Sequence, residues 1–233
     1  YFRKFNHSKM TFSLMYAYSE NFILVLSHDE VVHLKCSMLG KMPGDKDDKF
    51  ANLKLAYAYM SGHPGKKLLF MGQEFGQWNE WSEKKALDWY LLEDPSHKEL
   101  KEFTKACMML NKKYKCLYET DYSPEGFRWI NANDRDNSVF SFIRISPDKK
   151  RHLLFVLNFT PVERMHHRIG VPIKGKYKLV LGDDLKNQKK TLTSIHGECD
   201  GYKDSLLIDL HRYGIAVYEF NGDVNAHKPT KIS

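Results

Sequence analysis

The sequence predicts two fold classes in one chain, an α/β part over residues 1–120 and an all-β part over residues 121–233. The first part alternates long apolar runs with stretches in which apolar residues recur every three or four positions. The second part holds short runs of β-forming residues separated by Asn, Asp, Gly, Lys and Pro. With 233 residues, of which 42% are hydrophobic and 28% charged, the chain is long enough for two domains of ordinary globular composition.

The first strand–helix unit begins with NFILVLS, residues 21–27. This continuous apolar run is typical of a strand buried on both faces of a parallel sheet. A helix is predicted after the turn MPGD, with acidic residues near its positive end and the breaker SGHPG at its close. Its apolar face carries Phe50, Leu53, Tyr57 and Met60.

The second unit opens with KKLLFMGQEF, residues 66–75, which predicts another buried strand. A long helix follows, and we expect it to begin at a capping box formed by Ser96 and Glu99. One face of this helix carries Leu100, Phe103, Cys107, Leu110, Tyr114 and Leu117.

Five short runs predict strands in the all-β part, and their spacing is typical of an antiparallel β-sandwich. They are VFSFIRI (139–145), LLFVLNF (153–159), YKLVL (177–181), LLIDL (206–210) and GIAVYEF (214–220).

Two strand–helix units raise a physical problem, because they cannot close a parallel barrel by themselves. An open pair of strands would leave unpaired edges and apolar faces in water. We therefore expect residues 1–120 to be the last strand–helix units of a larger α/β barrel. On this interpretation the chain is a fragment, or it needs further material to complete its fold.

Charge and composition argue against several classes of function. The formal net charge of +7 invites a nucleic-acid hypothesis, but Lys and Arg are scattered and often stand beside acids, as in DKDDK. No apolar run approaches the roughly 20 residues that a membrane span needs. The start, YFRKFNHSKM, lacks an initiator Met and a signal-peptide core, which predicts a mature or truncated chain. We expect neither a nucleic-acid nor a membrane partner.

The four cysteines show no CxxC pair and no zinc-ligand spacing. Thiols this sparse favour a reducing compartment, so the expected location is cytoplasmic. We expect the cysteines to be free thiols with mostly structural roles.

Polar residues follow both predicted strands of the α/β part. Ser27, His28, Asp29 and Glu30 come after the first strand, and Gln73 and Glu74 come after the second. In α/β barrels the reactive residues lie at the carboxyl ends of the strands, so both groups are expected at one rim. The alternative is that they are solvated loop residues, since polar residues are common where strands end.

Metal chemistry is not favoured by these motifs. HDEVVH does not satisfy HExxH, because His28 and His33 stand five positions apart with Asp in second place. Glu30 and His33 form one ExxH pair, where a di-metal site would need two. GHPGKK likewise fails as a phosphate-binding loop. We expect no metal and no cofactor.

Several long motifs resemble the C-terminal third of bacterial 1,4-alpha-glucan (glycogen) branching enzymes, in the alpha-amylase superfamily. They are LSHDEVVH, MPGDKDDKFANLK, PGKKLLFMGQEFGQWNEW, LDWYLLE and NFTPV. The resemblance implies a (β/α)8 TIM barrel followed by a β-sandwich. It also implies cleavage of alpha-1,4 glucan chains and their transfer to a 6-hydroxyl, with alpha-glucan and the missing N-terminal part of the barrel as partners.

By this resemblance Asp29 is the third catalytic carboxylate, which stabilises the transition state, and His28 contacts a substrate hydroxyl. The family's nucleophilic Asp and acid/base Glu lie on earlier barrel strands that precede residue 1, so the chain alone is expected to be inactive. Glu30 and Glu74 are further candidates for substrate binding, although a structural role near the barrel mouth is an equal alternative for Glu74.

Trp78 and Trp81 are candidate glucan contacts, because aromatic faces suit pyranose rings, and core packing is the alternative for each.

Two rival functions stay open. One is a non-catalytic glucan-binding or accessory module, and the other is an alpha-amylase-type glycoside hydrolase or debranching relative, which shares the HD element. The stretches MPGDKDDKFANLK and GQEFGQWNEW favour branching.

Overall fold

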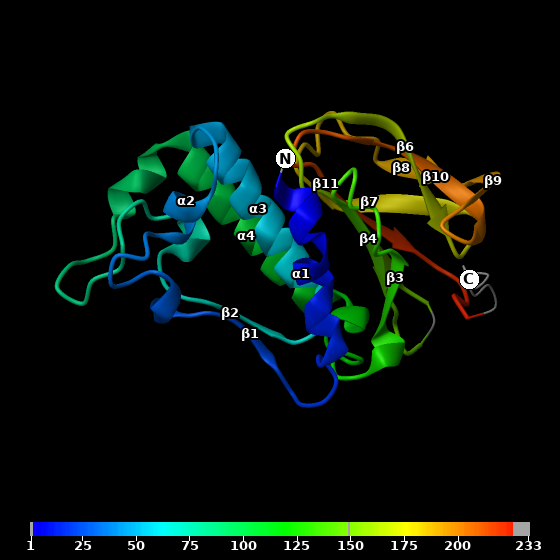
Figure 1. Cartoon of the computed structure of the whole chain (residues 1–233), viewed down its shortest axis with the longest axis horizontal. Coiled ribbons are helices and arrows are strands. Elements are labelled where there is room, and N and C mark those ends of the chain that lie inside the picture. The colour runs from blue at the N-terminus through cyan, green and yellow to red at the C-terminus, as the bar shows by residue number, and fades with distance from the viewer. Residues whose placement is uncertain (1, 149, 226–233) are drawn as a thin grey trace. The chain divides into compact units, whose positions relative to one another are not determined.

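The computed structural model describes residues 2–148 and 150–225 (Figure 1). Its contacts divide the chain into two compact units. One unit contains Tyr1–Asn21 together with Tyr114–Ser233, and the other contains Phe22–Lys113. The chain therefore passes between the units at residues 21–22 and 113–114, whereas the sequence predicts a boundary at residue 120. The assignment of residues 1–120 to a barrel stays a prediction.

The unit Phe22–Lys113 contains a sheet of two parallel strands among its described residues. Strand β1, Ile23–Leu26, pairs with β2, Lys66–Leu69, in a register that runs from Ile23 opposite Lys66 to Leu26 opposite Leu69. The long helix α3, Lys46–Gly62, connects them, which makes the segment a strand–helix–strand crossover. Both predicted strands and the helix between them are present, but β2 ends at Leu69, and Gln73–Phe75 of the predicted second strand form a 3-10 helix instead.

The expectation that these strands are buried on both faces is wrong for this chain. Ile23 is 55% exposed and Val25 is 49% exposed, whereas Leu24 and Leu26 on the opposite face are partly covered. The reason is that the sheet has only two strands among the described residues, so too little structure surrounds it to cover both faces.

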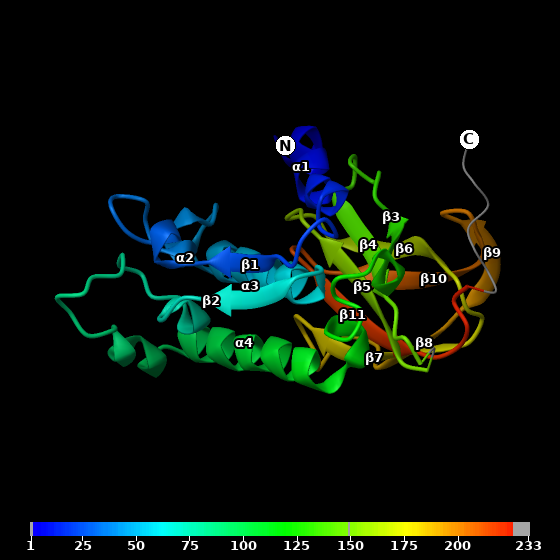
Figure 2. The same cartoon turned by 90° about the horizontal axis from the view of Figure 1, so that it is seen from below.

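Two long helices supply most of the remaining core of this unit. Helix α4, Pro95–Lys113, packs along α3, and Figure 2 shows the two side by side. The predicted apolar stripe is buried along α4. Its last two residues, Tyr114 and Leu117, lie beyond the helix and belong to the other unit, where Leu117 ends the 3-10 helix η6, Lys115–Leu117. A cavity of about 190 Å³ lies among β2, α3 and α4.

The helix starts are capped by aspartates. The Oδ1 atom of Asp45 accepts the backbone N–H of Asp48 at 2.9 Å, which begins α3. At α4 the predicted capping box is wrong, because Ser96 already lies inside the helix. Its backbone N–H donates to Oδ1 of Asp94 at 2.9 Å, while Glu99 pairs with Lys54 instead. Pro95 occupies the first turn, where its missing N–H costs nothing.

Short helices complete the loops of this unit. They are η3 (His28–Glu30), α2 (Met38–Lys41), η4 (Gln73–Phe75) and η5 (Trp89–Glu93). Leu39 of α2, Phe75 of η4 and Leu100 of α4 are fully buried.

The described residues of the other unit form two antiparallel sheets, which confirms the all-β prediction. The larger has the order β3-β4-β5-β11-β7-β8 and the smaller has the order β6-β10-β9. The strands are β3 Phe127–Asn131, β4 Val139–Arg144, β5 His152–Asn158, β6 Arg164–Val171, β7 Lys176–Gly182, β8 Thr191–Thr193, β9 Ile195–Cys199, β10 Tyr202–Leu210 and β11 Ile215–Phe220. A short 3-10 helix, η7 (Pro124–Gly126), precedes β3.

One apolar core joins the two sheets. Ile169 and Leu206 from the smaller sheet belong to the same buried cluster as Val156, Ala216 and Tyr177 from the larger one. Strands β4 and β5 are buried along their whole length, as expected for central strands covered on both faces.

The first residues of the chain belong to this β-rich unit. They form η1 (Phe2–Asn6), α1 (His7–Phe12) and η2 (Ser13–Met15). Arg3 Nη1 donates to the carbonyl of Phe159 at 2.6 Å, and the His7 ring stacks on Phe140 with centroids 4.0 Å apart.

Candidate active site at the end of strand β1

The polar turn after β1 is held by Ser27. Its Oγ accepts the backbone N–H of Asp29 at 3.3 Å and lies 3.4 Å from Oδ2 of the same residue. Ser27 is therefore the N-cap of η3, and this cap turns the chain out of the strand direction. His28, Asp29 and Glu30 consequently emerge together where β1 ends.

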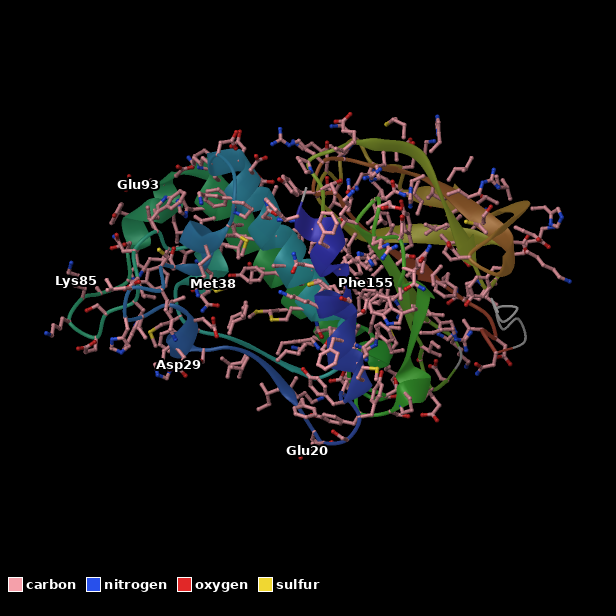
Figure 3. The ribbon with its side chains drawn as sticks, in the orientation of Figure 1. Glu20, Asp29, Met38, Lys85, Glu93 and Phe155 are labelled. Atoms are coloured by element: carbon pink, nitrogen blue, oxygen red, sulfur yellow. The ribbon has the colours of Figure 1, made fainter. Side chains whose placement is uncertain are left out.

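His28 and Asp29 form an exposed pair. The Nε2 atom of His28 lies 3.3 Å from Oδ1 of Asp29, with 56% and 69% of their side chains exposed. The His28 ring also lies 6.0 Å from that of Phe70, which follows β2. Figure 3 shows Asp29 on the turn that follows β1. Both groups are open to solvent and can meet a molecule that approaches this turn.

The ends of the two parallel strands meet, as the sequence predicted. The carbonyl of Leu26 accepts the backbone N–H of Phe70 at 3.0 Å and the side-chain Nε2 of Gln73 at 3.2 Å. Gln73 is buried, and its backbone carbonyl accepts a hydrogen bond from the Tyr57 hydroxyl at 2.8 Å. The buried Gln73 side chain therefore connects the segment after β2 to the end of β1.

The two glutamates at this edge have different surroundings. Glu30 is exposed and lies beside Lys41 of α2, whose Nζ contacts both its backbone carbonyl and, at 3.4 Å, its Oε2. Glu74 is partly buried in η4. Burial raises the pKa of Tyr57, and the charge of nearby Glu74 adds to that increase.

The two tryptophans pack on other rings of the same unit. Trp78 meets Phe50 edge-on at 6.1 Å and lies 5.9 Å from the His97 ring, yet 37% of it stays exposed. Trp81 is partly buried and meets Phe70 edge-on at 5.1 Å. Both therefore have packing contacts, and Trp78 keeps the larger free surface for a ligand.

A carboxylate that the sequence interpretation did not single out binds the loop after η3. Glu80 accepts the backbone N–H of Leu34 on Oε2 at 3.1 Å and that of Cys36 on Oε1 at 2.6 Å. The partners stand 46 and 44 positions apart, so no local pattern reveals them. The one available signal is the position of Glu80 beside Trp81 in the motif GQWNEW.

The described residues contain no group of three or more His, Cys, Asp or Glu that could hold a metal ion. Over the same residues, none of the helices combines the length and apolar character needed to cross a bilayer. All four cysteines are free, and burial raises the pKa of the Cys107 and Cys116 thiols to about 12.

Comparisons with known proteins show which enzymes the chain resembles. The chain is 49% identical over 228 residues to the 1,4-alpha-glucan branching enzyme GlgB of Butyrivibrio fibrisolvens. It is 51% identical over 185 residues to the enzyme of the same name from Aquifex aeolicus, and 53% over 183 residues to that of Thiobacillus denitrificans. The chain matches the C-terminal part of branching enzymes. The resemblance predicted from the motifs is confirmed.

These alignments cover much of the chain but a minor part of each branching enzyme. They include 94%, 79% and 78% of this chain, and 36%, 29% and 25% of the respective relatives. Residues 129–221 also match the family model of the alpha amylase C-terminal all-beta domain.

Solved structures support the fold. AmyP in complex with maltose superimposes with a TM-score of 0.53 at 15% identity, covering 80% of this chain and 36% of AmyP. An AmyP variant in complex with maltotriose reaches 0.63 at 16% identity, covering 93% of this chain and 44% of the variant. At these identities the likeness concerns the fold alone.

Proposed function

We propose that this chain is the C-terminal part of a 1,4-alpha-glucan branching enzyme, to which it contributes Asp29 and His28. The observation that carries the proposal is the exposed His28–Asp29 pair at the carboxyl end of β1, beside the end of a parallel neighbour. The similarity to branching enzymes over 94% of the chain supports it.

Asp29 is the proposed transition-state stabiliser. Retaining glycoside transfer passes through an oxocarbenium-like state and a covalent glycosyl–enzyme intermediate. A carboxylate about 4 Å from the developing positive charge gains roughly 4 kcal/mol at an effective dielectric constant near 20. If most of this appears only in the transition state, it accelerates the reaction about a thousandfold.

The neighbours of Asp29 have supporting roles in this proposal. His28 donates a hydrogen bond to a hydroxyl of the sugar at the cleavage point. Trp78 offers an exposed aromatic face to a pyranose ring. Glu30, Glu74 and Trp81 line the same edge and bind further glucose units.

The proposal includes a (β/α)8 barrel of which β1 and β2 are the last strands. Neighbouring barrel strands would cover the exposed Ile23 and Val25, which are costly to leave in water. The nucleophilic Asp and the acid/base Glu would come from that additional structure. We therefore expect the 233-residue chain to be inactive by itself, and alpha-glucan to be the substrate of the whole enzyme in the cytoplasm.

The test compares the full-length protein encoded by the gene with the 233-residue chain, both incubated with amylose. We expect the full-length protein to lower iodine colour and form alpha-1,6 branch points while releasing little reducing sugar. Reducing sugar without branches would instead identify a hydrolase. A gene that encodes no Asp and Glu at strand ends upstream of Tyr1, or branching by the 233-residue chain alone, would contradict the proposal.

The binding-module alternative is tested by affinity electrophoresis of the 233-residue chain in gels that contain glycogen. Under our proposal the sugar contacts need the whole barrel, so migration should match that in gels without glycogen. Strong retardation together with an inactive full-length protein would favour an accessory module.

A further inference from the structure

The loop that follows the catalytic turn has an unusual backbone. His33, Leu34 and Cys36 have φ angles of 56°, 66° and 63°, in the left-handed region that residues with a Cβ rarely adopt. Leu34 cannot gain stability from burial to offset this, because it is 96% exposed. Other contacts must therefore hold loop 31–36 in this shape.

Those contacts come from the dipeptide Glu80–Trp81. The Glu80 carboxylate accepts the N–H groups of Leu34 and Cys36, one on each oxygen, at 3.1 and 2.6 Å. The backbone N–H of Trp81 donates to the carbonyl of Val31 at 3.0 Å. The dipeptide thus binds the loop at its beginning, middle and end.

The same loop reaches back to Asp29. Lys35 stands between the two clamped N–H groups, and its Nζ donates to the backbone carbonyl of Asp29 at 2.8 Å. The N–H of Val31 donates to the carbonyl of His28 at 2.9 Å, which closes the turn that carries Asp29. A change in loop 31–36 therefore reaches two of the hydrogen bonds that hold this turn, which Ser27 holds from its other end.

We propose that Glu80 is a positioning residue: its carboxylate holds loop 31–36 in the left-handed conformation and thereby fixes Asp29 for catalysis. The inference about the loop stands on these contacts alone, and the inference about catalysis rests on the proposed function. Carboxylate hydrogen bonds to backbone N–H groups are stronger than neutral ones, which suits this task.

Glu80→Gln is an informative substitution because it keeps the shape of the side chain. Gln has one acceptor oxygen, whereas the loop presents two N–H donors, so its amide group would place a donor opposite a donor. We expect amide hydrogen exchange at Leu34 and Cys36 in the 233-residue chain to become roughly tenfold faster. The matched control is Glu83→Gln, which alters an exposed glutamate of the same segment and should leave both rates unchanged.

Leu34→Gly provides a rescue that a general loss of stability would not allow. Glycine adopts positive φ without steric cost, so it removes part of the need for the clamp. In the full-length protein, Glu80→Gln should lower kcat for branching about tenfold and leave KM for amylose within about twofold. Adding Leu34→Gly should recover much of the lost kcat.

The outcomes separate this inference from the proposed function. Unchanged exchange at Leu34 and Cys36 in the Glu80→Gln chain would overturn the clamp. Faster exchange with unchanged kcat, or no recovery on adding Leu34→Gly, would overturn its role in positioning Asp29. A neutral effect of Asp29→Asn on branching would instead overturn the proposed function, and the catalytic half of this inference with it.

Discussion

At the scale of single residues, a fully buried ion pair distinguishes the β-rich unit. Arg144 Nη2 lies 3.0 Å from Oδ1 of Asp121, and their side chains are 0% and 1% exposed. The Nε of Arg144 also donates to the carbonyl of Gly126 at 3.1 Å. Breaking a buried pair by removing one charge is expensive, because the other charge stays in a medium that solvates it poorly.

We predict that Asp121→Asn lowers the free energy of unfolding by about 3–5 kcal/mol, measured by urea denaturation. The control is Glu119→Gln, which removes an exposed pair with Lys115 and should cost less than about 0.5 kcal/mol. Equal effects of the two substitutions would show that burial of the first pair has no energetic consequence.

A second prediction concerns pH and His211. The Nδ1 atom of His211 lies 2.9 Å from Oδ2 of Asp183, and this hydrogen bond raises the pKa of His211 above 6.5 despite partial burial. The resulting stabilisation is complete below about pH 6.5 and is lost as the pH rises through the higher folded-state pKa. His211→Asn should therefore destabilise the chain more at pH 5.5 than at pH 8.5.

The measurement is urea denaturation of both proteins at the two pH values. Comparing the variant with the unchanged chain at each pH cancels the titration of the other histidines. A larger effect of the substitution at the higher pH would contradict the assigned direction of the shift.

At the scale of elements, the N-cap of α3 is the clearest local determinant. Asp45 Oδ1 satisfies the N–H of Asp48, one of the donors that a helix start leaves without an internal partner. Asp45→Ala should therefore cost about 1 kcal/mol, whereas Asp45→Ser, which keeps an acceptor, should cost little. Thermal denaturation followed by circular dichroism checks both predictions. Equal melting temperatures for the two variants would show that the Asp45 side chain does not stabilise the start of α3.

The exposed face of β1 allows a test of the proposed barrel. Val25 is 49% exposed in this chain, so Val25→Thr should change its free energy of unfolding by less than about 0.5 kcal/mol. In the full-length protein we expect neighbouring strands to bury the same position, where an unpaired hydroxyl costs about 1–3 kcal/mol. A small effect in both proteins would argue against a barrel around β1.

The strength of the local pattern decides which elements the sequence predicts. Strands β4, β5 and β11 lie within the predicted runs or differ by one residue, because buried central strands are continuously apolar. Strands β6 and β9 were not predicted, since RMHHRIGV and IHGEC are partly exposed edge strands with few apolar residues. Edge strands depend on pairing with a distant partner, which a single sequence does not display.

In the candidate site, too, the sequence predicts the residues that local patterns mark and misses those whose role depends on distant contacts. His28 and Asp29 could be singled out because they follow a recognisable strand and belong to a specific motif. Glu80 could not, because its role depends on backbone N–H groups more than forty residues away.

At the scale of the whole molecule, the chain spans about a quarter to a third of the branching enzymes it matches. Among the residues that the structure describes, β1 and β2 form a parallel pair without the further strands that a parallel sheet normally has. The proposed enzyme is therefore larger than this chain. Its proposed chemistry needs Asp29 and His28 from this chain together with the nucleophilic Asp and the acid/base Glu from the additional structure.

The most direct test of the account is the rate of branch formation by the full-length protein with Asp29→Asn. The change removes the charge and keeps the size of the side chain, which is 69% exposed, so folding should be unaffected. We predict a fall in kcat of at least about a hundredfold, with an unchanged circular dichroism spectrum. A variant that branches amylose at close to the normal rate would contradict the central claim that Asp29 takes part in catalysis.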